Sequence, residues 1–117
     1  MRVGADSAPE TRLRLALIRA GLPEPELQIV VDPSDPRSPE ADLGYRDARI
    51  ALQYDGAAHR TPEQQARDAR REAYCLELDW LPLRCTREDL REGFIRVIGL
   101  VRRRLGPRGA FGATSRR

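Results

Sequence analysis

Lysine and asparagine are absent from this chain of 117 residues, and all 21 basic residues are arginine. A coding bias toward GC-rich codons explains such a composition, so the absence by itself points to no function. It does exclude a lysine amine from any catalytic role, and arginine cannot serve as a base near neutral pH because it stays protonated. His59 is the only histidine, so it is the only side chain expected to titrate close to pH 7 without a strong perturbation.

Cysteine and long apolar runs are also scarce. Cys75 and Cys85 lack the spacing of metal ligands and are expected to be buried free thiols in a reducing compartment, with a disulfide or a zinc site as the alternative. No run approaches the roughly 18 apolar residues of a membrane span, and residues 1–10 lack the apolar core of a signal peptide. We therefore expect a cytoplasmic protein with no membrane partner.

Charge is distributed unevenly along the chain. Residues 1–95 carry fourteen arginines and eighteen acidic residues, whereas residues 96–117 carry seven arginines and no acid. A composition of 40% hydrophobic and 33% charged residues is that of one soluble globular domain, which we place at residues 1–105. Residues 106–117 are expected to form a basic disordered tail. If the acidic body binds DNA, the third helix and this tail must contribute.

Local patterns predict the order helix, three strands, helix, strand, helix. The first helix begins with a capping box formed by Ser7 and Glu10, the second with one formed by Thr61 and Gln64, and Thr86 caps the third. The expected elements are helices at 7–20, 62–78 and 86–105 and strands at 27–31, 40–45, 49–55 and 80–85.

Two patterns indicate how these elements pack. Pro82 removes one hydrogen-bond donor from the last strand, which favours an edge position or a local irregularity. The second helix carries a stripe of small and apolar residues that is expected to lie against the sheet: Ala66, Ala69, Ala73 and Leu76. Leu90, Phe94, Val97, Ile98 and Val101 recur at helical spacing, so the third helix is expected to pack by one face.

The second and third strands carry the most polar hairpin of the chain, residues 40–60. Ile50, Leu52 and Tyr54 alternate with polar or small residues, which is typical of a strand buried on one side. A tight reversal at Arg46-Asp47 predicts that facing residue numbers sum to about 93. Asp42 would then face Ala51.

In that register three oxygen-bearing side chains converge, from Asp42, Gln53 and Asp55. Together with the backbone carbonyl of Tyr54 they are the ligands that a hard divalent cation such as Mg²⁺ prefers. The alternative is an exposed polar sheet face with a turn aspartate, and the spacing alone does not decide between the two.

Together these pieces resemble the PD-(D/E)xK nuclease fold. The similarity is greatest to the branch related to the very-short-patch-repair endonucleases, often found C-terminal to an AbiEi-like winged helix in actinobacterial proteins. It rests on residues 4–15, 21–28, 40–45, 49–60, the pattern Arg67-Asp68-x-x-Arg71, Trp80 and residues 83–90. The resemblance implies an α/β (α+β) restriction-endonuclease-like αβββαβα core with a central mixed four-stranded sheet flanked by helices.

The resemblance also implies a site. Asp42 matches the metal-binding aspartate, Gln53 stands in place of the second acidic ligand, and Asp55 stands where the wider superfamily has its lysine. His59 matches a nearby histidine that could act as general base, and Glu10 matches a first-helix glutamate that can approach the metal through water.

The activity so implied is hydrolysis of DNA phosphodiester bonds with Mg²⁺ or Mn²⁺ held by Asp42, Gln53 and the Tyr54 carbonyl. Arg67 or Arg71 would clamp the phosphate. Because Gln53 is neutral, weak metal binding is expected. The alternative is a catalytically weak or inactive module of the same fold that binds nucleic acid, or that regulates a toxin–antitoxin or phage-defence system. The partners implied are DNA and a separate targeting or toxin–antitoxin protein.

Overall fold

The computed structural model describes residues 8–57 and 59–110. Its elements follow the predicted order, with the last helix divided in two. They are α2 (Pro9–Arg19), β1 (Glu26–Val30), β2 (Glu40–Tyr45), β3 (Ile50–Tyr54), α3 (Pro62–Glu77), β4 (Leu81–Cys85), α4 (Arg87–Arg91) and α5 (Ile95–Ala110).

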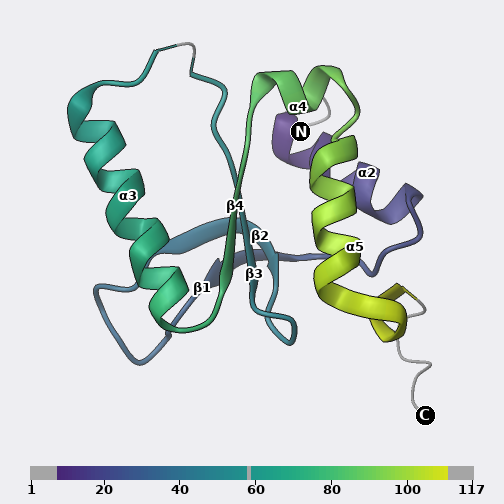
Figure 1. The fold of residues 1–117 in the computed structure, drawn as a ribbon, viewed down its shortest axis with the longest axis horizontal. Coiled ribbons are helices and arrows are strands. Elements are labelled where there is room, and N and C mark those ends of the chain that lie inside the picture. Colours follow the sequence, from purple (N-terminus) through teal and green to yellow (C-terminus); the bar gives the residue numbers. More distant parts are fainter. Residues whose placement is uncertain (1–7, 58, 111–117) are drawn as a thin grey trace.

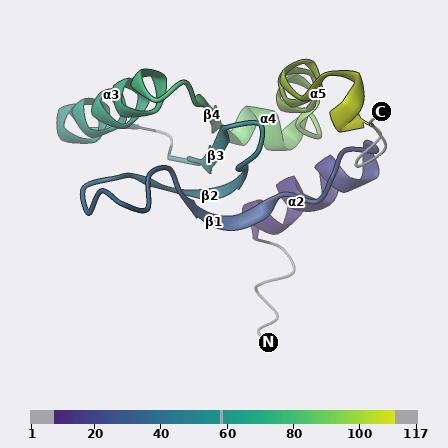
Figure 2. The same cartoon turned by 90° about the horizontal axis from the view of Figure 1, so that it is seen from below.

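The four strands form one mixed sheet in the order β1-β2-β3-β4. β1, β2 and β3 pair antiparallel, and β4 runs parallel to β3. The prediction of a mixed four-stranded sheet is confirmed, as is the edge position of the strand that contains Pro82. Helix α3 lies on one side of the strands and α2, α4 and α5 lie on the other (Figures 1 and 2).

Two apolar clusters cover the two faces of this sheet. On the side of α2 and α5, Ile50 and Leu52 are fully buried with residues of both helices, such as Leu17 and Val101. On the side of α3 the cluster is smaller and contains Ala51 but no large residue of β3. The predicted alternation of Ile50 and Leu52 on one face is confirmed, but burial on one side only is wrong, because Ala51 is buried on the other face. The two faces differ in how much apolar surface they bury.

Both cysteines are buried free thiols, as predicted. Cys75 belongs to the cluster beneath α3, and Cys85 belongs to the cluster of the other face. Burial raises the pKa of the Cys85 thiol to about 12, so this thiol stays protonated and unreactive at neutral pH.

The register of the β2-β3 hairpin differs from the prediction. Gly44 faces Ala51 and Tyr45 faces Ile50, so facing numbers sum to 95. The reversal is longer than expected because Arg49 adopts a positive φ of 57° and its N–H donates to the Arg46 carbonyl at 3.1 Å. The paired residues keep their predicted faces, but the pairing ends at Leu43 and Leu52. Asp42 lies beyond it and lines a groove beside α2, whereas Gln53 lines a cavity beneath α3, so the prediction that they share one face is wrong.

Gly44 lies at the closest backbone approach in this hairpin. A Cβ at this position would be 2.4 Å from the Ile50 carbonyl oxygen and 2.8 Å from Ile29 Cδ1. We expect Gly44→Ala to lower the free energy of unfolding by about 2 kcal/mol, because the obstructing oxygen belongs to the paired strand and cannot move aside. Gly99→Ala is the control, since nothing lies within 4 Å of its Cβ in α5. Urea unfolding of both variants checks this, and equal stabilities would contradict it.

The helix starts agree with the sequence at two of three places. Thr61 and Gln64 form the predicted capping box at α3, and Thr86 caps α4. Helix α2 begins at Pro9 after Ala8, which forms no side-chain cap. Ser7, the predicted cap, lies outside the described residues.

The predicted face of α3 is wrong. Ala66, Ala69 and Ala73 are exposed, and Leu76 retains 58% of its accessible surface. Only Cys75 of this helix is buried, near its C-terminal end. The helix therefore packs on the sheet at its C-terminal end. The rest of its length borders a cavity that Ala69 lines together with polar residues such as Gln65 and Asp68.

The predicted third helix is interrupted after α4. Gly93 and Phe94 have φ values of 70° and 61°, which no α-helix accommodates. The break allows Phe94 to be fully buried beside Val97 and Val101, so the predicted packing face is retained. The predicted stop at Gly106 appears as a bend with φ of 73°, after which the backbone remains helical to Ala110. The rest of the predicted tail lies outside the described residues.

Candidate functional site

The antiparallel ladder between β2 and β3 ends at the pair Leu43 and Leu52. One step further, the Tyr54 N–H donates to Asp42 Oδ2 at 3.1 Å instead of to a backbone carbonyl. The Asp55 N–H donates to the Cys85 carbonyl at 2.8 Å, so this end of β3 stays attached to β4. The two central strands thus separate at the predicted site, and the Asp42 carboxylate bridges the opening.

Asp42 lies in an electrostatically unfavourable position for a carboxylate. Burial raises its pKa, as do the nearby charges of Glu10 and Glu40, whereas the Tyr54 N–H and the Arg71 guanidinium lower it, with a net rise. Asp42 and Glu10 line one groove between α2 and β2. The predicted neighbours Asp42 and Glu10 are therefore brought together, in a place where a cation would relieve the repulsion.

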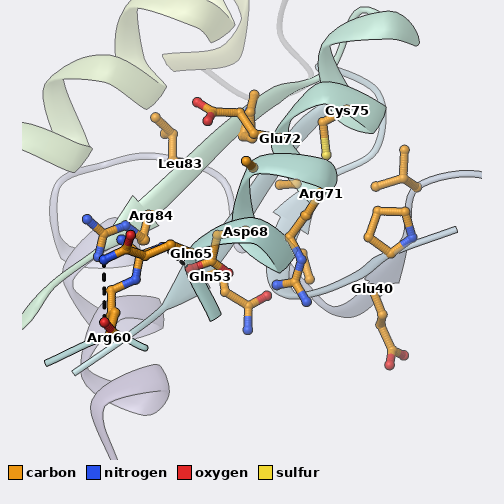
Figure 3. A pocket seen from close by; sticks show the side chains of 16 residues that line it. Glu40, Gln53, Arg60, Gln65, Asp68, Arg71, Glu72, Cys75, Leu83 and Arg84 are labelled. Atoms are coloured by element: carbon orange, nitrogen blue, oxygen red, sulfur yellow. Dashed lines mark hydrogen bonds and ion pairs between the residues drawn. The ribbon is translucent and has the colours of Figure 1, made fainter. Parts of the chain in front are cut away.

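Gln53 lines a different hollow, a cavity of about 500 Å³ beneath α3. Its Oε1 is buried and has no hydrogen-bond donor, although a buried polar atom normally finds a partner. Figure 3 shows Arg60 and Arg84 at one end of this cavity and Arg71 with Glu40 at the other, with Gln53 between them. Three arginines and three acidic residues line the cavity, so its charges are balanced.

Asp55 is held by two arginines. Its Oδ2 lies 3.6 Å from Arg60 Nε and 3.7 Å from Arg84 Nη1, and its Oδ1 accepts from the Ala57 N–H at 3.1 Å. Arg60 also pairs with Asp68 of α3. Asp55 lines a third hollow of about 340 Å³, which shares Arg60 and Arg84 with the cavity beneath α3.

The predicted oxygen ligands therefore do not line one common pocket. Asp42 borders the groove beside Glu10, Gln53 borders the cavity beneath α3, and Asp55 borders the hollow beyond Arg60 and Arg84. His59 is exposed. Within residues 8–57 and 59–110, no group of three or more histidine, cysteine or acidic side chains is arranged to hold a metal ion.

The two predicted phosphate clamps both lie in α3, but only Arg71 reaches the Gln53 cavity. Arg71 lines the Gln53 cavity and also a hollow against the loop at Asp32 and Asp35, whereas Arg67 lines only the latter. Two other arginines that line these concavities, Arg60 and Arg84, were given no role by the sequence patterns. A signal for Arg60 was its place between His59 and the Thr61 cap, but nothing local indicates that Arg84 pairs with Gln53 in the β3-β4 ladder.

Comparison with known proteins gives two relatives, both from Mycobacterium tuberculosis: the uncharacterized protein MT2308 of strain CDC 1551 / Oshkosh and the uncharacterized protein Rv2248 of strain ATCC 25618 / H37Rv. Each is 32% identical to this chain over 102 residues, which is 86% of this chain. The chain spans 38% of the length of these relatives. No protein-family model and no solved structure matches it.

None of the helices within the described part of the chain combines the length and apolarity that crossing a bilayer requires.

Proposed function

We propose that this chain is a cytoplasmic, divalent-metal-dependent endonuclease that hydrolyses phosphodiester bonds of DNA, built on a restriction-endonuclease-like core. The observation that carries the proposal is the unpartnered Gln53 Oε1, which lies beside the opening that Asp42 bridges. Leaving a buried acceptor unsatisfied costs about 1–3 kcal/mol. A bound ligand that approaches this oxygen with positive charge would offset that cost.

The donor types suit a hard cation, but Asp42 and Gln53 line different concavities, so any ion that they share is expected to be held weakly. Asp42, Gln53 and the Tyr54 carbonyl supply only oxygen, which Mg²⁺ and Mn²⁺ prefer, but only one of the three carries charge. Such an ion, when bound, polarises a phosphate and lowers the pKa of a water molecule. Arg71 borders the Gln53 cavity and affects the charge of Asp42, so it is the residue that would orient a phosphate. His59 is exposed, and in this proposal it is the general base that would accept a proton from the attacking water molecule.

A second candidate function is a catalytically weak or inactive module that binds nucleic acid without chemistry. It is favoured by the ion pairs of Asp55 with Arg60 and Arg84, which occupy a carboxylate that a metal centre would otherwise use. In this case the Gln53 cavity receives a phosphate directly, and a separate targeting or toxin–antitoxin partner supplies the biological activity.

Gln53→Glu distinguishes the two functions. If the site holds a metal, the added carboxylate should tighten Mn²⁺ binding at least about tenfold, whereas Gln53→Leu should abolish it. If the cavity binds phosphate directly, Gln53→Glu should weaken DNA binding and Mn²⁺ should not bind. Mn²⁺ titration by calorimetry, paired with cleavage of supercoiled DNA with Mn²⁺ and with chelator, measures both. Gln65→Glu is the control, because Gln65 lines the same cavity with its amide bonded to the Arg60 carbonyl.

A further inference from the structure

The hollow of about 340 Å³ beyond Asp55 carries an excess of basic side chains. Four arginines line it with only two acidic residues, whereas charges in the cavity beneath α3 are balanced. The lining charges are Arg60, Arg84, Arg87, Arg91, Asp55 and Glu88. An excess of guanidinium groups in a concave surface favours an anion.

These arginines come from separate elements that meet at the end of β4. Arg60 precedes α3, Arg84 belongs to β4, and Arg87 and Arg91 belong to α4. Arg87 and Arg91 are four residues apart on one short helix, so they share a face. The hollow is thus assembled by the tertiary fold and is not a charged run along the sequence.

Arg91 Nη2 donates to Glu88 Oε2 at 2.6 Å and Arg60 Nη2 donates to Asp68, but other donors of this cluster remain open. Both ion pairs of Asp55, with Arg60 at 3.6 Å and with Arg84 at 3.7 Å, are longer than a hydrogen bond. Arg60 Nε is buried and lacks a hydrogen-bond acceptor. Arg87 is exposed. A ligand oxygen at this place could therefore form bonds that the protein leaves open.

Hydrogen bonds fix the backbone between β4 and α4, which carries two of the lining arginines. Arg96 donates from Nη2 to the Arg84 carbonyl at 3.0 Å and pairs with the buried Asp89 of α4. Asp89 in turn accepts from the Thr86 N–H at 2.9 Å. The backbone that carries Arg84 and Arg87 is thus fixed by hydrogen bonds, which lowers the entropic cost of binding.

We propose that this arginine-lined hollow is a phosphodiester subsite that holds a backbone phosphate of a nucleic-acid strand next to the phosphate bound beneath α3. The inference rests on the proposed function and deepens it. Because the two concavities share Arg60 and Arg84, a strand would pass over these side chains from one to the other. The ligand must then carry at least two backbone phosphates separated by a nucleoside, which a nucleic-acid strand has and a mononucleotide lacks.

The salt dependence of binding tests the subsite without any catalysis. We expect the double variant Arg87→Gln, Arg91→Gln to bind a single-stranded oligonucleotide about tenfold more weakly, and to reduce the slope of log K against log salt by about 0.7, the value for one lost phosphate contact on a single strand. Fluorescence anisotropy in chelator, from low to moderate salt, gives both numbers. The matched control is Arg12→Gln, Arg19→Gln, which removes the same charge from two exposed positions of α2.

The outcomes separate this inference from the proposed function. Equal slopes for the two double variants overturn the subsite. It is also overturned if Arg87→Gln, Arg91→Gln weakens the binding of inorganic phosphate but leaves the binding of the oligonucleotide unchanged. If the slope does not change while Mn²⁺-dependent cleavage is retained, only the subsite fails. If the wild-type protein binds no oligonucleotide at all, both proposals fail. Circular dichroism should show all variants folded, because Arg87 and Arg91 are exposed.

Discussion

Asp42→Asn is expected to reduce Mn²⁺-dependent DNA cleavage at least about 100-fold. The variant removes the one charged donor proposed for the metal, and losing about 3 kcal/mol of charge stabilisation corresponds to a factor of this size. The asparagine carbonyl can still accept the Tyr54 N–H that Asp42 Oδ2 accepts at 3.1 Å, so the opening between the central strands stays bridged. Initial rates of plasmid nicking measure the effect.

The same variant should not lose stability. Burial and neighbouring acids raise the pKa of Asp42, so the folded state disfavours its charged form, and a neutral side chain should leave the melting temperature equal or higher at pH 7. Asp47→Asn is the control, because this exposed residue lies in the turn of the same hairpin. Cleavage by Asp42→Asn at the rate of Asp47→Asn would rule out the metal assignment and leave the binding module.

Asp89→Ala is expected to cause the largest loss of stability, about 3 kcal/mol. Asp89 retains only 6% of its accessible surface and binds Arg96 through two hydrogen bonds of 3.0 and 2.9 Å. It also accepts from Thr86 at the start of α4. Removing the carboxylate leaves the Arg96 guanidinium without its acidic partner and the Thr86 N–H without its acceptor. Urea unfolding at pH 7 measures the loss.

The contribution of Asp89 should depend on pH in a defined direction. Hydrogen bonds from Arg96 lower its pKa to about 2, below the ordinary value of 3.8. The stabilisation is therefore complete above about pH 4 and is lost as the pH falls toward 2. Glu88→Ala is the control, because its ion pair with Arg91 is exposed and should be worth less than about 1 kcal/mol. A loss in Asp89→Ala no larger than in Glu88→Ala would contradict the assignment.

These two aspartates link fold and proposed function in different ways. Asp42 is in a position where its charge is unfavourable, which is typical of a functional site. The charge of Asp89 is fully compensated, and its partner Arg96 also binds the carbonyl of Arg84, which lines both concavities. A variant at Asp89 should therefore affect nucleic-acid binding only through the position of Arg84.

The sequence by itself determined the features that depend on neighbouring residues. The capping box at Thr61, the cap at Thr86, the alternation of Ile50 and Leu52 and the order of the elements follow from hydrogen bonds and side-chain periodicity within a few residues. They are decided before distant segments meet. The polar hairpin could be singled out for the same reason, since its oxygen-bearing residues lie within one short stretch.

Only the tertiary structure decided the register at Gly44, the face that α3 turns to the sheet, and the pairing of Asp55 with Arg60 and Arg84. Each depends on contacts between residues that are distant along the chain, or on a backbone conformation that the residue type does not predict. The positive φ of Arg49 is an example of the latter. The stripe of Ala66, Ala69, Ala73 and Leu76 on α3 was misleading because this helix packs on the sheet only near its C-terminal end. There it buries Cys75, so the pattern along the rest of the helix does not predict its buried face. The separation of the predicted ligands into adjoining concavities follows from these same long-range choices.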